Sequence, residues 1–131
     1  MAFVGAQARL PDAWSDMFTH IDALIVPTVP APAARRDQDA FTWPDGTVEP
    51  VVEAYVRLNA GANLSGLPAL TVPAGLHASG LPFGVQFIGP SRSEVVLLQL
   101  GQVVETITGA LPGLARSNAG NARIASLSSL A

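Results

Sequence analysis

Two Gly-Leu-Pro triplets divide residues 63–90 into two β-rich runs, and this regularity constrains the fold more than any other feature of the chain. The runs cover residues 69–72 and 83–88, and each of them ends at a glycine or a proline. A turn through residues 77–80 separates the runs, a spacing that predicts an antiparallel pair of strands. Gly84, inside the second run, predicts a bulge or close packing against a bulky neighbour.

Apolar residues in the first part of the chain predict a short helix followed by a buried strand. The helix spans residues 11–21, where apolar side chains recur at i, i+3, i+4 and i+7 (Trp14, Met17, Phe18 and Ile21). Residues 22–27 then form a continuous apolar run after Asp22. A run without a polar face predicts a buried strand that is central or parallel in its sheet.

Two further helices flank the predicted hairpin in the sequence. One begins at Glu49 or Pro50, and its apolar face comprises Val51, Val52, Tyr55, Leu58 and Ala62. The other follows a capping box, in which Ser91 caps the first turn and Glu94 bonds back to the serine amide. We expect this helix to continue to about Thr108 and to bury Val96, Leu97, Leu100, Val104 and Ile107.

These elements predict an α/β fold, with a partial mixed sheet and flanking helices. We assign residues 1–111 to one unit, in which residues 27–48 form a long proline-rich loop. Residues 112–131 are poor in large apolar side chains and rich in Ser, Ala, Gly and Asn. We therefore expect this last segment to be a disordered tail.

The composition excludes several classes of function. The seven basic side chains are all arginines, which lie scattered, and the net charge is −3, so no nucleic-acid partner is expected. The chain has no cysteine and hence no disulfide or thiolate nucleophile. No apolar run approaches the roughly 20 residues of a membrane span, and the N-terminus does not resemble a secretory signal. By elimination we expect a cytoplasmic protein without a membrane partner.

Charged residues make up 13% of the chain, about half of the usual share of roughly 25%. A small domain has a large surface relative to its volume and normally needs more charge than this. The composition therefore suits an interior piece of a larger protein.

The residues that carry chemistry in hydrolases and metalloproteins are sparse. The two histidines are His20, at the end of the first helix, and His77, in the hairpin turn. A Ser-His-Asp site is possible on paper, but a structural or solvated role explains both histidines, and no Gly-x-Ser-x-Gly motif is present. No metal-ligand spacing occurs, so no metal or other cofactor is expected. Residues 91–94 could bind an anion, although helix capping already accounts for them.

Three segments, taken in order, resemble the C-terminal part of the amidase signature family. They are the helix and strand ending in Pro27-Thr28, residues 57–69, and the run from Gly80 to Gly89 with the helix that follows. The likeness is strong over residues 57–105, weaker over residues 12–32 and negligible in the tail. It implies the C-terminal portion of an α/β/α fold with a mixed, twisted sheet.

The resemblance implies cleavage of linear amide bonds by two serines and a lysine. In that chemistry one serine attacks the amide carbonyl, lysine acts through the second serine as acid and base, and backbone amides stabilise the oxyanion. These groups belong to an earlier part of the family's chain. Because this sequence contains no lysine, no catalytic residue is assigned to it, and we expect it to be inactive alone.

The same likeness implies a supporting role in the substrate cleft. Thr28, at the end of the first strand, and the segment from Arg57 to Asn63 are the candidates to contact substrate. Strand ends in open α/β sheets commonly face the ligand crevice. A structural role competes for each residue, since Asn63 could stabilise the turn into Gly66 and Arg57 could be an exposed helix charge.

Two functions remain open from the sequence. In the first, the chain is a truncated or separately encoded part of an amidase-type hydrolase, and its partner is the complementary N-terminal part. The small-molecule amide substrate then binds only to the complete enzyme. In the second, the chain is a stand-alone α/β module with a binding or structural role, which self-associates through its apolar surface.

Overall fold

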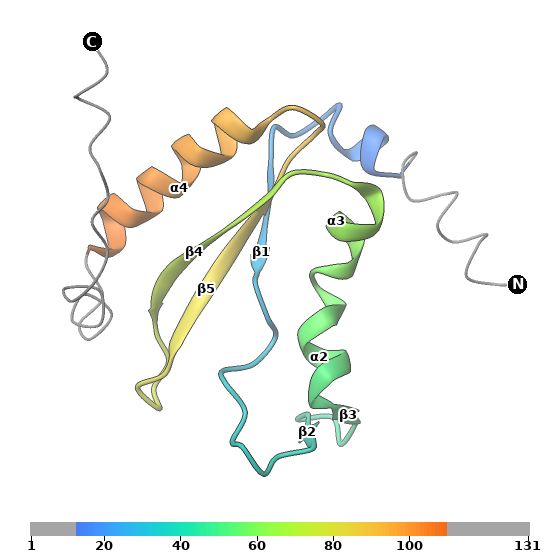
Figure 1. The fold of residues 1–131 in the computed structure, drawn as a ribbon, viewed down its shortest axis with the longest axis vertical. Coiled ribbons are helices and arrows are strands. Elements are labelled where there is room, and N and C mark those ends of the chain that lie inside the picture. The colour runs from blue at the N-terminus through green and yellow to red at the C-terminus, as the bar shows by residue number, and fades with distance from the viewer. Residues whose placement is uncertain (1–12, 110–131) are drawn as a thin grey trace, which may run out of the picture.

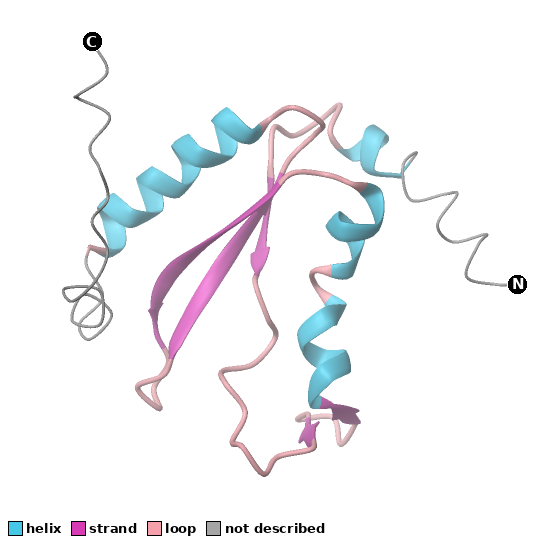
Figure 2. Cartoon of the chain, in the orientation of Figure 1, coloured by secondary structure: helices cyan, strands magenta, loops and turns pink. Residues whose placement is uncertain are grey.

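The computed structural model describes residues 13–109, in which helices lie on both sides of a small antiparallel sheet (Figure 1). Residues 13–17 form a helical turn that precedes the first strand. The elements that follow are β1 (Leu24–Pro27), β2 (Ala40–Thr42), β3 (Val48–Pro50), α2 (Val51–Arg57), α3 (Ala60–Ser65), β4 (Ala69–Leu76), β5 (Pro82–Ile88) and α4 (Glu94–Thr108). Figure 2 shows the same elements by type.

The main sheet has the order β1-β5-β4, and both pairs of neighbouring strands are antiparallel. The prediction of a hairpin between the two Gly-Leu-Pro runs is confirmed, and β4 extends further than expected, to Leu76. The prediction of a central or parallel strand for residues 22–27 is wrong within the described residues. There β1 has β5 as its one neighbour, and Ile25 is exposed. An apolar run indicates burial on both faces but does not specify which strands lie beside it.

Gly84 lies where three segments approach closely, as its position within a strand predicts. A Cβ atom on this residue would lie 3.0 Å from Thr28 Oγ1 and 3.1 Å from the Val72 carbonyl oxygen. The register of β4 against β5 also shifts between Pro73 and Gly75, next to this point. A Cβ atom here would force the end of β1 or the β4 backbone to move by a few tenths of an ångström, which favours glycine.

The apolar core lies between the sheet and α4. Val72, Phe87 and Leu97 are buried there and pack with partly buried neighbours that include Leu70 and Val104. The helix approaches closely at Gly101, where a Cβ atom would lie 2.7 Å from the Leu70 side chain. Helices α2 and α3 lie on the opposite side of the sheet (Figure 1).

Helix α4 ends at Thr108 as predicted, but its beginning corrects the expected capping box. The N-cap is Ser93 rather than Ser91, and it makes no side-chain capping bond. Pro90 to Ser93 form a turn first, in which the Ser93 amide donates to the Pro90 carbonyl over 3.2 Å. This turn places the first helical residue at Glu94, so Glu94 cannot serve as the third residue of the helix. Val96 and Ile107, expected to be buried, are exposed.

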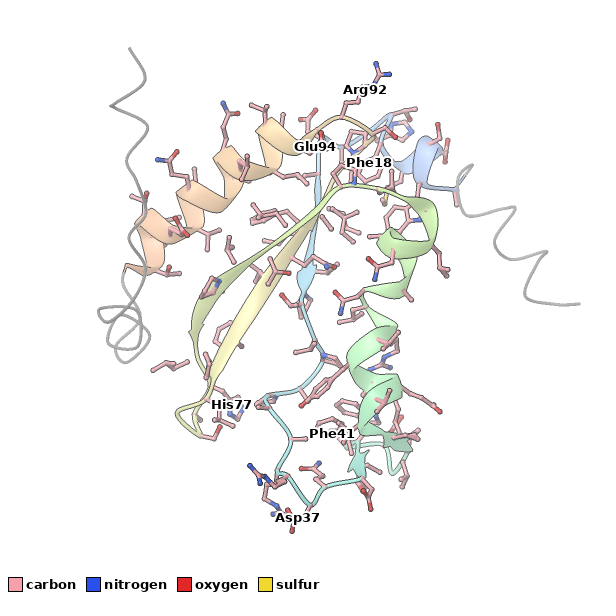
Figure 3. The ribbon with its side chains drawn as sticks, viewed as in Figure 1. Phe18, Asp37, Phe41, His77, Arg92 and Glu94 are labelled. Atoms are coloured by element: carbon pink, nitrogen blue, oxygen red, sulfur yellow. The ribbon has the colours of Figure 1, made fainter. Side chains whose placement is uncertain are left out.

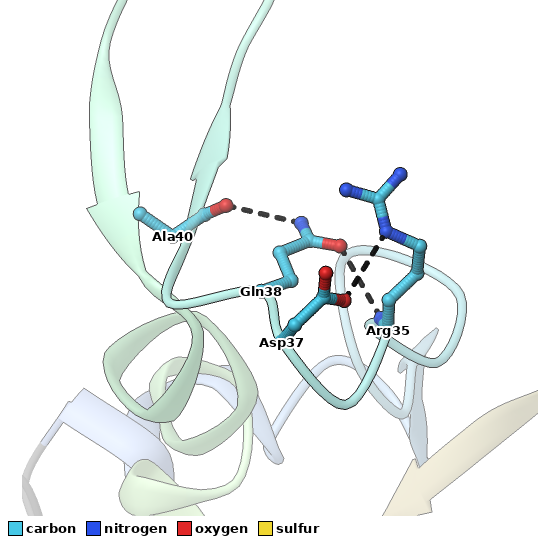
Figure 4. Close-up of polar contacts among 4 residues, drawn as sticks. All are labelled: Arg35, Asp37, Gln38 and Ala40. Carbon is cyan, nitrogen blue, oxygen red and sulfur yellow. Dashed lines mark hydrogen bonds and ion pairs between the residues drawn. The ribbon is translucent and has the colours of Figure 1, made fainter.

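The proline-rich loop contains a short hairpin, β2 with β3, that the sequence pattern did not indicate. Phe41 of this hairpin packs edge-on against Tyr55 of α2, with ring centroids 5.7 Å apart. The Tyr55 hydroxyl donates to the Pro32 carbonyl over 3.0 Å and so ties the loop to the helix. Further along the loop, Arg35 and Asp37 form an exposed ion pair, and Gln38 bonds to neighbouring backbone (Figure 4).

The expected disordered tail, residues 112–131, lies outside the described residues. Over residues 13–109, none of the helices combines the length and apolar character needed to cross a membrane.

Candidate functional site

Thr28, the first of the predicted substrate contacts, directly follows β1 and lies against the middle of the sheet. Its amide donates to the Gly84 carbonyl over 3.0 Å, which continues the pairing of β1 with β5. Its hydroxyl lies 3.5 Å from the Thr71 hydroxyl of β4, at the limit of a hydrogen bond. The Thr28 side chain therefore projects over β5 toward β4 and is only partly buried.

Asn59 connects this strand end to the helices. The sequence predicted one helix through residue 62, but the structure divides it into α2 and α3 at Leu58 and Asn59. The Asn59 amide nitrogen donates to the Thr28 carbonyl over 3.2 Å and to the Tyr55 carbonyl over 2.9 Å. Its side-chain oxygen accepts a hydrogen bond of 2.8 Å from the Gln86 amide nitrogen. Three of the four hydrogen-bonding positions of this side chain are thus in use: both amide donors and one of the two acceptor sites of the oxygen.

Gln86 is the buried polar residue in the middle of β5. It lies opposite Val26 of β1 and Thr71 of β4, and only 6% of it is exposed. Its amide nitrogen bonds to Asn59, but its side-chain oxygen Oε1 is buried and finds no partner among the described residues. An unpaired buried acceptor costs about 1–3 kcal/mol, so this oxygen is a site where a hydrogen-bond donor is strongly favoured.

Thr28, Asn59 and Gln86 together form a polar cluster that joins β1, the α2–α3 junction and β5. Sequence reasoning named Thr28, included Asn59 only as part of the segment from Arg57 to Asn63, and assigned no role to Gln86. Gln86 could have been found from its position, because it is a single long polar side chain within an apolar strand, Val85 to Ile88. Asn59 gave no comparable signal, since an asparagine in a helix is usually exposed.

Arg57, the second predicted contact, is engaged away from this cluster. Its guanidinium lies 3.5 Å from the Glu49 carboxylate and 5.5 Å from the centre of the Trp43 ring. The Trp43 indole nitrogen donates to the same carboxylate over 2.8 Å. Arg57 therefore fastens the end of α2 to the β2–β3 hairpin through a partly exposed ion pair.

Asn63, the third predicted contact, lies one turn beyond Asn59 on α3. Its amide donates to the Asn59 carbonyl over 3.2 Å, as in an ordinary helical turn. Its side chain is exposed and has no hydrogen bond among residues 13–109. The structure thus brings Thr28 into the polar cluster and leaves Arg57 and Asn63 outside it.

The two histidines do not form a catalytic site. His77 lies at the exposed tip of the β4–β5 hairpin, where its Nδ1 atom is 2.9 Å from the Ser79 hydroxyl (Figure 3). His20 is exposed in the turn after the first helix, at the other end of the sheet. In the part of the chain that the structure describes, no three His, Cys, Asp or Glu side chains are grouped to hold a metal ion.

The sequence and the fold can be compared with those of known proteins. A family model described as Amidase matches residues 4–98. An amidase from Pseudomonas putida is 43% identical over 96 residues, which cover 73% of this chain and 20% of the relative. A subunit of the glutamyl-tRNA(Gln) amidotransferase from Azorhizobium caulinodans is 37% identical over 102 residues, which cover 76% of this chain and 19% of the relative.

Solved structures agree with the sequence relatives. A crystal structure of an amidase superimposes with a TM-score of 0.74 at 26% identity, over 81% of this chain and 24% of that chain. The fold is therefore the α/β fold of amidase-signature enzymes. This chain belongs to the Amidase family. It spans about a fifth of the length of the curated relatives it matches.

Proposed function

We propose that this chain is the C-terminal part of an amidase-type hydrolase of linear amides, and that it supplies one wall of the substrate cleft. The Ser-Ser-Lys triad that the family resemblance implies then lies in a complementary N-terminal part. Family membership over residues 4–98 supports the reaction class, and the absence of lysine from the sequence excludes a complete triad in this chain. The chain alone is inactive under this proposal.

The observation that carries the proposal is the polar cluster at the end of β1. Its residues come from three elements, and the buried Gln86 Oε1 has no donor among the described residues. A buried polar group without a partner is costly for stability alone, and such groups are characteristic of functional sites. One of its members, Thr28, directly follows the carboxyl end of β1.

Within this wall, we assign direct substrate contact to the hydroxyl of Thr28 and the exposed amide of Asn63. Each can form a hydrogen bond with a polar group of an amide substrate. Arg57 is the third candidate, and its pairing with Glu49 makes it the least available of the three. Asn59 and Gln86 hold the Thr28 backbone in place, so they act as positioning residues.

The proposal also covers partner and location. The complementary amidase part is the partner, no nucleic acid or membrane is bound, and the assembled enzyme is cytoplasmic. A small protein with so little charge and with unpaired sheet edges is expected to be unstable or to aggregate when produced alone.

Co-expression tests the proposal directly. The full chain is produced with the Pseudomonas putida amidase from which the matching segment has been deleted, and the purified assembly is assayed on a broad panel of amides. We expect hydrolysis by the assembly and none by either part. A stable, folded assembly without turnover would contradict the proposal, as would hydrolysis by this chain alone.

A matched pair of variants tests the role of Thr28. Thr28→Val keeps the shape of the side chain and removes its hydroxyl, so we expect kcat/KM of the assembly to fall about tenfold, the loss of one hydrogen bond. Thr42→Val, at the exposed end of β2, is the control and should leave kcat/KM within about twofold. If the two substitutions change kcat/KM equally, the Thr28 hydroxyl does not contact the substrate.

The alternative function is a self-associating module, which the exposed apolar side chains on α2 and α4 favour. It predicts a cooperative unfolding transition for the chain alone and a defined oligomer by light scattering. Aggregation of the isolated chain, relieved by the complementary part, would exclude it.

A further inference from the structure

A groove of about 520 Å³ lies between α4 and β1, on the face of the sheet opposite α2 and α3. We call it the α4–β1 groove. Its apolar lining includes Ile21, Ile25, Phe87, Val96 and Leu100. Asp22 is the one charged residue among its lining residues, and it lies beside the beginning of β1.

Val96 and Leu100 belong to an apolar stripe of α4 that continues beyond the groove. Val96, Leu100, Val103 and Ile107 are spaced by four, three and four residues and therefore share one stripe of the helix. The neighbouring stripe, with Leu97 and Gly101, packs on the sheet, and Leu100 also contacts the core there. Ile107 is 78% exposed and Val103 54%, so the first stripe lacks a cover over most of its length.

The usual spacings of helices and strands indicate that one more helix fits in the α4–β1 groove. Neighbouring strands lie about 4.8 Å apart and packed helices about 8–10 Å apart, so one helix covers about two strands. Helix α4 packs mainly on β4 and less on β5, which leaves β1 uncovered on this face. One more helix placed beside α4 would lie directly over β1 and against the exposed stripe.

We propose that the α4–β1 groove is the docking site of an amphipathic helix from the complementary part of the amidase. The helix runs beside α4 and covers Ile25 and the Val96–Ile107 stripe with its apolar face. A basic residue of the helix pairs with Asp22. This inference rests on the proposed function, because the complementary part supplies the helix.

The length of the relatives favours this occupant over a second copy of the chain. The relatives carry the matching segment within a single chain about five times as long, so additional elements of the same fold are available to cover it.

Adjacent valines on α4 provide a matched test. Val96 lines the groove and is 40% exposed, whereas Val95 points to solvent and is 67% exposed. Both lie in the first turn of α4, so aspartate affects the helix itself alike at either position. The tagged full chain with Val96→Asp or Val95→Asp is co-expressed with the Pseudomonas putida amidase that lacks the matching segment, and the co-purified partner is quantified.

We expect Val96→Asp to reduce the recovered partner about tenfold or more, because the groove would enclose an unpaired charge. Val95→Asp should match the unsubstituted chain within about twofold. A second pair of substitutions on α4 controls for misfolding of the variants. Val103→Asp, on the exposed stripe, should also reduce the recovery of the partner. Leu98→Asp, on the opposite flank of the helix, should not reduce it. Circular dichroism of each purified chain confirms that α4 is retained.

Equal recovery for Val96→Asp and Val95→Asp would overturn the inference. So would a homodimer of the chain that Val96→Asp dissociates, since that result assigns the groove to a second copy. Failure of the unsubstituted chain to co-purify likewise rejects the proposed occupant. An assembly that forms with the expected pattern but hydrolyses no amide would sustain the docking site and reject the proposed function.

Discussion

The two faces of the β1-β5-β4 sheet differ in how they are packed. The face toward α4 is apolar, with Val72, Phe87 and Leu97 buried against one another. The face toward α2 and α3 carries the cluster of Thr28, Asn59 and Gln86, where one buried acceptor stays unpaired. The first face stabilises the fold through burial, whereas the second places polar groups at defined positions and sacrifices stability to do so.

The largest expected effect is on the apolar face. Leu97→Ala removes a side chain that is 2% exposed and leaves a cavity, so the free energy of unfolding should fall by about 2–5 kcal/mol. Leu98, its neighbour, is 61% exposed, and Leu98→Ala should cost about 0.5 kcal/mol or less. Urea unfolding of this chain within the assembled complex measures both values. Similar losses at the two positions would mean that α4 does not cover the sheet as described.

An intermediate effect is expected at the centre of the polar cluster. Asn59→Ala removes three hydrogen bonds and leaves the Gln86 amide without a partner, which should cost about 1–3 kcal/mol. Asn63→Ala, one turn further on, is the control and should change stability by about 0.5 kcal/mol or less. Urea unfolding of the chain within the assembled complex measures both changes in stability. A neutral Asn59→Ala would show that the cluster does not hold β1 to the helices.

Gln86→Leu should separate stability from function on the polar face. The substitution removes the unpaired oxygen but also the bond to Asn59, and these effects oppose each other. We therefore expect a stability change within about 1 kcal/mol, together with a reduced kcat of the assembled enzyme. A large loss of stability with unchanged kcat would make Gln86 a structural residue like those of the apolar face.

The smallest effect lies in the exposed turn between β2 and β3, which belongs to neither face. The Thr47 amide donates to the Asp45 carboxylate over 2.9 Å, and this hydrogen bond lowers the pKa of Asp45 below its usual range. Because the folded pKa lies below the unfolded value of about 3.9, the contact stabilises the fold above that pH. Its contribution is lost as the pH falls through the folded pKa.

Asp45→Ala measures this contribution. The difference in unfolding midpoint between the variant and the unsubstituted chain should be small at neutral pH and vanish in acid. A carboxyl titration by NMR gives the pKa itself. A pKa at or above the usual aspartate value would contradict the hydrogen bond.

The sequence predicted the helices and strands themselves better than it predicted which parts of the fold pack beside each of them. The hairpin, the end of α4 and the close packing at Gly84 follow from local patterns, and all three are present. The prediction that Val96 and Ile107 are buried was wrong. Helical periodicity identifies the apolar face of a helix but does not specify which part of that face contacts the sheet. The N-cap shifted to Ser93 because a turn that the capping pattern does not encode precedes the helix.

The sequence by itself determined the family, the antiparallel hairpin whose two strands each follow a Gly-Leu-Pro triplet, and the absence of a lysine for catalysis. Tertiary structure alone decided that Thr28, Asn59 and Gln86 meet and that a groove beside α4 is left uncovered. The physical reason is distance along the chain. Strand and turn patterns repeat within a few residues, whereas Gln86 finds Asn59 across 27 residues and Asn59 finds Thr28 across 31, through packing that no local pattern records.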